Sequence, residues 1–121
     1  NVGNKSEAFK KMNPPAPLGE FEQLVLLAVM RLEGEAYAVP IRQEIEDRTS
    51  RSVARGALYV TLDRLEEKGY LKSWLADATA ERVGRAKRFY EVKPAGVKAL
   101  EHSWTALRSM WEGLDPRRRE A

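Results

Sequence analysis

Hydrophobic positions along the chain recur at intervals that predict four helices and one pair of strands. Residues 18–32 are apolar around most of a helix circumference, so the first helix is expected to be heavily buried. A short connector at 36–39 follows. A second helix is then predicted at 40–49, where a proline opens the first turn and Ile41 and Ile45 point inward.

A third helix, at 54–68, follows a turn at 49–53 and has one apolar face. Its core stripe has spacing i, i+4, i+8 and i+11 and consists of Ala54, Leu58, Leu62 and Leu65. Gly69 is expected to end this helix with a positive φ. Two strands, at 70–76 and 87–93, flank a polar loop with several basic residues. The pattern predicts a mainly α fold with a small β-hairpin, a winged helix-turn-helix.

The last predicted helix runs from about 95 to 113, directly after Pro94. Its large apolar residues alternate steps of three and four, which makes a heptad seam. The seam consists of Val97, Leu100, Trp104, Leu107, Trp111 and Leu114. A lone helix cannot bury two Trp on one edge. The pattern therefore predicts a partner helix, most simply from a second copy of the chain.

These elements divide the chain into four parts. Residues 14–93 are expected to form the winged helix-turn-helix domain and residues 94–114 the dimerisation helix. Residues 1–13 have no periodicity and are expected to be a flexible leader, with Met12 as the natural start. Residues 115–121 are expected to form a frayed basic tail.

Composition narrows the location of the protein. The 121 residues are 43% hydrophobic and 32% charged, and no apolar run approaches the roughly 18 residues of a membrane span. The start of the chain lacks the apolar region of a signal peptide. Cys is absent, which excludes disulfides and thiolate metal sites. We expect a cytoplasmic protein with no membrane partner.

The distribution of charge says more than the total. The net charge is only +3, with an isoelectric point of about 9.3. Residues 48–56 contain three Arg and no acid, and residues 81–88 contain four basic residues and one acid. Acids gather at 44–47 and 66–67 instead. The two basic stretches are where a nucleic-acid contact is expected.

In a helix-turn-helix, the first turns of the second helix enter the major groove of DNA. Here those turns expose Ser52, Arg55, Gly56, Tyr59 and, one turn later, Asp63. An Arg can donate two hydrogen bonds to guanine, and a glycine lets the backbone approach closely. A Tyr hydroxyl can donate to a phosphate. The alternative is that these side chains are only a solvated helix face.

The predicted hairpin adds a second set of candidate contacts. Arg82, Arg85 and Lys87 are expected to meet phosphates or the minor groove, and Arg88 lies either in the loop or within the strand that follows. Arg51, in the turn before the recognition helix, joins the candidate DNA-binding set. A basic loop can also be merely solvated, but its position behind a recognition helix favours DNA.

The two tryptophans of the seam have two interpretations. Trp104 and Trp111 can be interface packing between two subunits. They can also line a pocket for a small effector, because flat aromatic ligands stack well on indole.

The residue inventory does not support an enzyme. His102 is the only histidine and Cys is absent, so neither a typical zinc site nor a Cys–His pair can be assembled. The carboxylates lie on helix faces expected to be solvated, and no glycine-rich phosphate loop is present. We expect no enzymatic activity, no metal and no cofactor.

Two segments, GALYVTLDRLEEKGYL and KRFYEVKPAGVKAL, resemble the PadR family of transcriptional regulators in sequence, order and separation. The opening LGEFEQLVLLAVMRL and the following AYAVPIRQEIE are also similar to the first two helices of that family. The resemblance covers 18–114. It implies a winged helix-turn-helix, a homodimer built through a single C-terminal helix, and repression of nearby genes. Some family members are relieved by phenolic acids or other planar aromatic compounds.

Several residues match family positions directly. The resemblance implies that Tyr59 is the tyrosine of the recognition helix and that Arg64 and Lys68 are the basic positions further along it. It also implies that Gly96 and Leu100 mark the start of the dimer helix. Two helix starts depart from the family. Lys93 stands where Thr is usual, and Ala54 stands where Ser is common, so each of these helices lacks a typical N-cap.

Two functions remain in view at this point. The first is a homodimeric repressor that binds a pseudo-palindromic operator in double-stranded DNA and responds to a planar aromatic effector. The second is a winged-helix module that binds another protein through the same surface. Steep weakening of binding with salt would distinguish the first from the second.

Overall fold

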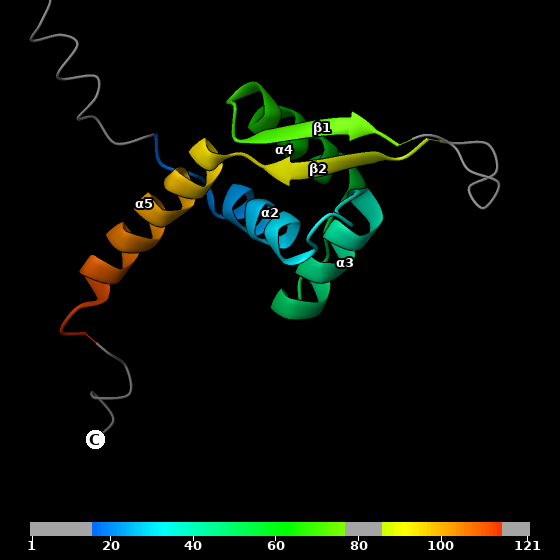
Figure 1. The fold of residues 1–121 in the computed structure, drawn as a ribbon. Coiled ribbons are helices and arrows are strands. Elements are labelled where there is room, and N and C mark those ends of the chain that lie inside the picture. The colour runs from blue at the N-terminus through cyan, green and yellow to red at the C-terminus, as the bar shows by residue number, and fades with distance from the viewer. Residues whose placement is uncertain (1–15, 77–85, 115–121) are drawn as a thin grey trace, which may run out of the picture.

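The computed structural model describes residues 16–76 and 86–114 (Figure 1). The predicted leader, the basic tail and most of the loop between the two strands, called the wing below, lie outside these residues. The elements in chain order are α2 (Glu20–Arg31), α3 (Ala38–Thr49), α4 (Arg55–Glu67), β1 (Leu71–Leu75), β2 (Arg88–Val92) and α5 (Pro94–Trp111). This is the mainly helical fold with a two-stranded hairpin that the sequence predicts.

Helix α2 forms the centre of the domain. It contacts α3, α4, β2 and α5, which surround it (Figure 1). The apolar circumference seen in the sequence is explained by these contacts, since Val25, Leu26, Ala28 and Val29 are all buried. Leu27 and Met30 remain exposed on the outer side of the helix.

One buried carboxylate fixes the N-terminus of α2. Glu22 accepts a hydrogen bond from the Gly19 backbone N–H at 2.8 Å and another from Lys68 Nζ at 2.7 Å. Burial raises the pKa of the Glu22 carboxyl. The hydrogen bonds from Lys68 and Gly19 outweigh that effect and hold the pKa below its usual value. The ion pair between Glu22 and Lys68 ties α2 to the residue that follows α4.

Helix α3 begins at Ala38, two residues earlier than the sequence predicts. Pro40 is therefore inside the first turn, where a missing backbone N–H costs nothing. The predicted connector at 36–39 is correspondingly shorter. The buried Ala36 accepts a hydrogen bond through its carbonyl oxygen from the Tyr90 N–H at 2.8 Å, which joins the connector to β2.

The core stripe of α4 differs from the prediction at its first position. Leu58, Leu62 and Leu65 are buried as expected, but Ala54 is exposed and is the N-cap residue outside the helix. Because the chain is extended there, the neighbouring Val53 turns inward and is buried instead. The predicted stripe is therefore wrong at Ala54, which precedes the helix.

The hairpin follows α4 directly. Gly69 has a φ of +80° and ends the helix, as the sequence predicts. Strands β1 and β2 pair antiparallel, with Leu71 opposite Val92 and Trp74 opposite Phe89. Each strand is one residue shorter at both ends than expected.

Helix α5 begins at Pro94 and extends away from the body of the domain (Figure 1). Its first half is anchored at Gly96, where an added Cβ would lie 2.5 Å from the backbone oxygen of Tyr70. Only a glycine allows so close an approach. In the part of the chain that the structure describes, no helix is long and apolar enough to span a bilayer.

Candidate nucleic-acid interface

The exposed face of α4 presents the residues predicted to meet DNA. Arg55 is the first residue of the helix and is exposed, and Tyr59, one turn later, is 46% exposed. Between them, Gly56 is open: an added Cβ would meet no atom within 4 Å. The start of α4 therefore offers a donor, a phenol and a bare stretch of backbone on one accessible surface.

Arg55 and Tyr59 also line a groove between α4 and α3. The groove has a volume of about 460 Å³, and α3 contributes Arg42 and Gln43 to it. The Arg42 Nε is buried, lies 3.6 Å from the Glu46 carboxylate and has no hydrogen-bond partner among the described residues. The hydrophobic pattern of α3 predicts its inward residues, Ile41 and Ile45, but does not indicate this groove.

The turn between α3 and α4 is held by a carboxylate that was not singled out from the sequence. Glu46 accepts a hydrogen bond from the Val53 N–H at 2.8 Å, two residues before α4. Ser50, in the same turn, has a left-handed φ of 56°. Because Glu46 bridges the turn, it sets where α4 starts relative to α3. The spacing of Arg42 and Glu46 by four residues indicates their ion pair, but nothing in the local pattern indicates the bond to Val53.

Two of the three arginines in the basic stretch at 48–56 already form ion pairs within the domain. Arg51 donates to Glu20 through Nη2 at 2.6 Å, which ties this turn to the start of α2. Ser52, beside it, is exposed. Arg55 therefore carries the charge of this stretch at the helix start.

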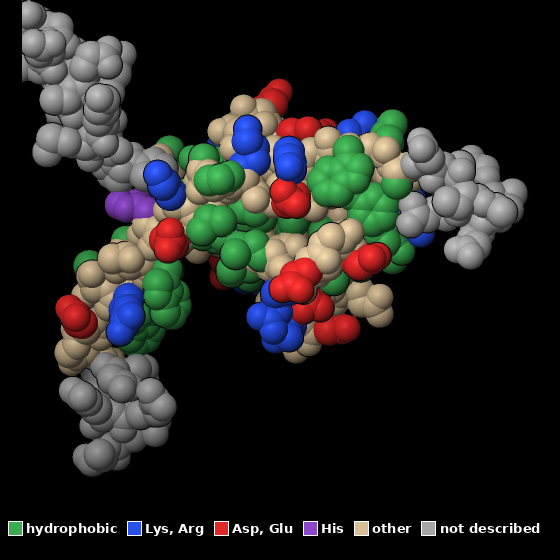
Figure 2. Space-filling model, in the orientation of Figure 1, with side chains coloured by type: hydrophobic (Ala, Val, Ile, Leu, Met, Phe, Trp, Pro, Cys, Tyr) green, Lys and Arg blue, Asp and Glu red, His purple; other side chains and the backbone are tan. Residues whose placement is uncertain are grey.

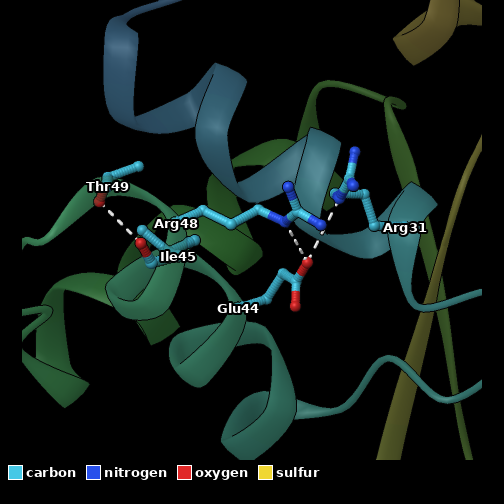
Figure 3. A network of polar contacts seen from close by, with 5 residues as sticks. All are labelled: Arg31, Glu44, Ile45, Arg48 and Thr49. Atoms are coloured by element: carbon cyan, nitrogen blue, oxygen red, sulfur yellow. Dashed lines mark hydrogen bonds and ion pairs between the residues drawn. The ribbon is translucent and has the colours of Figure 1, made fainter.

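The other paired arginine belongs to the network drawn in Figure 3. Arg48 Nε and Arg31 Nε both donate to one oxygen of Glu44, at 2.7 and 3.2 Å (Figure 3). The hydrogen bond from Arg48 is the main reason that the pKa of the Glu44 carboxyl lies below its usual value. The network joins α2 to α3 across the domain surface and offsets part of the positive charge counted from the sequence.

Two basic residues near the end of α4 interact with Glu22 of α2: Arg64 in the helix and Lys68 just after it. Lys68 is bound to the buried Glu22, and the charge of Arg64 also lowers the pKa of that carboxyl. Lys68 therefore holds the domain together. Arg64 is exposed and remains a candidate DNA contact.

The described part of the hairpin places two of the four predicted wing residues. Lys87 Nζ lies 4.2 Å from the centroid of the Tyr37 ring, a cation–π contact that keeps the charge at the base of the wing. Arg88 lies within β2 and donates to Ser73 Oγ at 2.9 Å. Arg82 and Arg85 lie outside the described residues.

The Ser73 hydroxyl, which accepts from Arg88, also binds a residue of α4. It donates to Glu66 at 2.7 Å, so a chain of polar contacts runs from β2 through β1 to the recognition helix. On the other face of the hairpin, Phe89 stacks on Trp74 and meets Tyr37 edge-on. The polar contacts thus fix the hairpin relative to α4, and the aromatic contacts tie it to Tyr37 at the start of α3.

The predicted seam on α5 separates into two parts. Leu100 is buried in the domain core and Val97 is partly buried. The remaining members are exposed: Trp104, Leu107, Trp111 and Leu114. Figure 2 shows hydrophobic side chains on the part of α5 that extends beyond the domain. Leu114 lies just after the helix.

A helix-turn-helix with an exposed second helix, followed by a hairpin fixed against that helix, defines a winged helix-turn-helix, a class of DNA-binding domain. The family model of PadR-like transcriptional regulators matches residues 26–102, well over half of the chain. The chain belongs to the PadR-like family of transcriptional regulators. Regulators of this family are DNA-binding proteins and not enzymes.

Solved structures agree with this fold. A transcriptional regulator from Clostridium thermocellum is 21% identical, with a TM-score of 0.63 over 78% of this chain and 86% of that one. A PadR-like transcription factor from Bacteroides fragilis is 23% identical, with a TM-score of 0.60 over 98% and 97%. The complex structure of hsRosR-S1 is 26% identical, with a TM-score of 0.63 over 85% and 83%. No curated protein matches the chain significantly.

Proposed function

We propose that the chain is a homodimeric repressor that binds a pseudo-palindromic operator in the cytoplasm. The observation that carries this proposal is the open face of α4, where Arg55, Gly56 and Tyr59 are accessible together. Two such helices related by a two-fold axis would occupy half-sites about one helical turn apart, or a multiple of it. A bound dimer would exclude other proteins from the promoter, which is the basis of repression.

Roles within the interface differ in this proposal. Arg55 recognises guanine, since a guanidinium at the start of the helix can donate to two acceptors on one base edge. Tyr59 and Ser52 donate to phosphates beside it. Arg51, Arg64, Arg82, Arg85, Lys87 and Arg88 add affinity that does not depend on sequence. Arg51 and Arg88 contribute less than Arg64, because each already donates a hydrogen bond within the domain.

The dimer is proposed to form through α5. Trp104 is 65% exposed, and Leu107 and Trp111 are exposed beside it on the same face of the helix. Large apolar residues on a projecting helix are typical of a subunit interface. A second copy would cover all of them at once, and it would present the same residues in return.

A groove beside this seam supports regulation by a small aromatic compound. It lies between α2 and α5, has a volume of about 250 Å³, and is mostly apolar, with Met30 and Trp104 among its lining residues. Trp111 would contribute from the partner subunit, where the seam brings the two helices together. Quenching of tryptophan fluorescence by planar aromatic compounds would support this role. No quenching across a broad panel would leave both tryptophans as packing residues.

The alternative function is a winged-helix module that binds another protein through the α4 surface. The two functions differ in their response to salt. Binding to DNA releases counterions and weakens steeply as salt rises, whereas an apolar protein interface need not.

The first test is binding to the DNA upstream of the protein's own gene, compared with a random duplex at two salt concentrations. We expect tighter binding to the upstream DNA and a strong loss of affinity at high salt. Arg55→Ala is expected to cost about 1–3 kcal/mol on the preferred site and to relax base preference. Arg31→Ala is the matched control, because Arg31 is an exposed arginine on α2 that pairs with Glu44. Equal losses on both duplexes would refute the role of Arg55 in specificity.

A further inference from the structure

Beside Arg55 and Tyr59, the exposed surface of α4 carries a small apolar group near the start of the helix. Gly56, Ala57 and Val60 are all exposed, and helical spacing of three and four residues brings them together on adjoining positions. Val60 is 55% exposed, although the opposite face of the same helix buries Leu58 and Leu62. This group is called the apolar strip of α4 below.

The chemistry of the strip limits what it can recognise. The side chains of Gly56, Ala57 and Val60 have no hydrogen-bonding group, so they can neither bind a phosphate nor read donors and acceptors on a base edge. The one major-groove feature that apolar side chains recognise is the C5-methyl group of thymine. Asp63 and Arg64 follow Val60 on the exposed surface, so a phosphate contact at this end of the strip would come from Arg64 and not from the strip itself. Base edges are therefore the better match for this part of α4.

We propose that Val60, with Ala57 beside it, recognises thymine by packing on its C5-methyl group. The inference rests on the proposed placement of α4 in the major groove. Gly56 has a separate part in it, because the open space above its Cα lets the helix approach the base edges. Val60 then presents two methyl groups on a stiff β-branched side chain. Arg55 would select guanine, while the strip selects a neighbouring thymine.

Uracil tests this directly, because it differs from thymine only by the missing methyl group. The probe is a duplex that the wild-type protein enriches from a randomised library, with each thymine replaced by uracil in turn. At one or two positions per half-site, uracil is expected to weaken wild-type binding about fourfold, the value for one buried methyl group. Val60→Ala is expected to bind the thymine and uracil duplexes equally at those positions.

Val39→Ala is the matched control. Val39 is 62% exposed, on α3 rather than on the recognition helix. Truncating it removes the same two methyl groups from a similarly exposed site, and the penalty for uracil is expected to stay as in the wild type. Val60 and Val39 are both exposed, so neither change is expected to unfold the domain.

The outcomes separate this inference from the proposal on which it rests. Enrichment of a sequence without a uracil penalty at any position would overturn the inference alone. A penalty that persists unchanged in Val60→Ala would also overturn it, because another residue would then contact the methyl group. A protein that enriches no sequence at all would overturn the placement of α4 in the major groove and this inference with it.

Discussion

The two halves of α5 carry one continuous apolar seam, yet they differ in what covers it. In the first half, Gly96, Ala99, Leu100 and Ser103 are buried against the domain. In the second half, the large hydrophobic residues Trp104, Leu107, Met110 and Trp111 are exposed. The first half is thus part of the domain core. The second half lacks a cover within the described chain, although its side chains are larger and more apolar.

The difference shows that a heptad pattern marks apolar surface and does not say what buries it. The residues that contact the domain are mainly small, and Gly96, Ala99 and Ser103 lie three and four residues apart along one line. The seam of large residues is rotated from this line, and Leu100 is the only seam residue among those buried against the domain in α5. Small side chains allow the close approach that anchors the helix. The large ones stay exposed, and in the proposed dimer they face a second subunit.

Leu100→Ala is expected to have the largest effect on the anchored half. Leu100 is 8% exposed and belongs to the hydrophobic core of the domain. Truncation should leave a cavity and lower the free energy of unfolding by about 2–5 kcal/mol. Urea denaturation measures this loss. Leu75→Ala is the control, because Leu75 is exposed at the end of β1, outside the core and the proposed dimer interface, and should change folding of the domain far less.

Trp104→Glu tests the free half. A charge at the centre of the seam would have to be desolvated in the dimer, so the dissociation constant should rise at least about 30-fold, the size of a binding hot spot of about 2 kcal/mol. Sedimentation equilibrium measures it. Ser109→Glu places the same charge in the same half of α5, on the face away from the seam, and should leave the dimer intact.

A dimer that survives Trp104→Glu would contradict the proposed interface. It would move the contact elsewhere, and the exposed Leu27 and Met30 of α2 would be the next candidates. The two halves of α5 would then no longer differ in function.

Gly96→Ala tests how closely α5 is anchored. The new Cβ would lie 2.5 Å from the Tyr70 backbone oxygen and 2.8 Å from Val92 Cγ1, so the helix must shift. We expect unfolding to become about 1–3 kcal/mol easier, as for other overpacked sites. Gly56→Ala is the matched control, because its Cβ would meet nothing within 4 Å. Alanine there should stabilise α4 by up to about 1 kcal/mol. Equal effects at both glycines would refute the close contact.

Local signals in the sequence were enough to predict most of the fold. Gly69 ends α4 because a left-handed residue is needed there, and both predicted strands are correct to within one residue at each end. The exposed start of α4, with Arg55 and Tyr59, also follows from helical spacing alone. These features depend on residues only a few positions apart.

The missed features depend on partners far away in the chain. Arg51 is bound to Glu20, which is 31 residues earlier, and Lys68 is bound to Glu22, 46 residues earlier. Nothing in the basic stretch itself indicates that its charge is already paired. The line of small residues on α5 leaves no hydrophobic pattern in the sequence, because Gly, Ala and Ser contribute little apolar surface.

Lys93→Thr is the smallest expected effect, and it should strengthen the anchored half. Lys93 is the N-cap of α5, with an extended backbone at φ −81° and ψ 160°, but its side chain makes no capping hydrogen bond. A threonine hydroxyl in that geometry can accept from the free backbone N–H groups of the first turn. We expect a gain of about 0.5–1 kcal/mol in the free energy of unfolding. Lys98→Thr, at an exposed position inside the same helix, should give no gain, because threonine is a poorer helix former than lysine. Since the cap acts on folding of the first half only, the dimer dissociation constant of Lys93→Thr should equal that of the wild type. A tighter dimer would mean that the two halves of α5 are coupled, and the distinction between an anchored and a free half would fail.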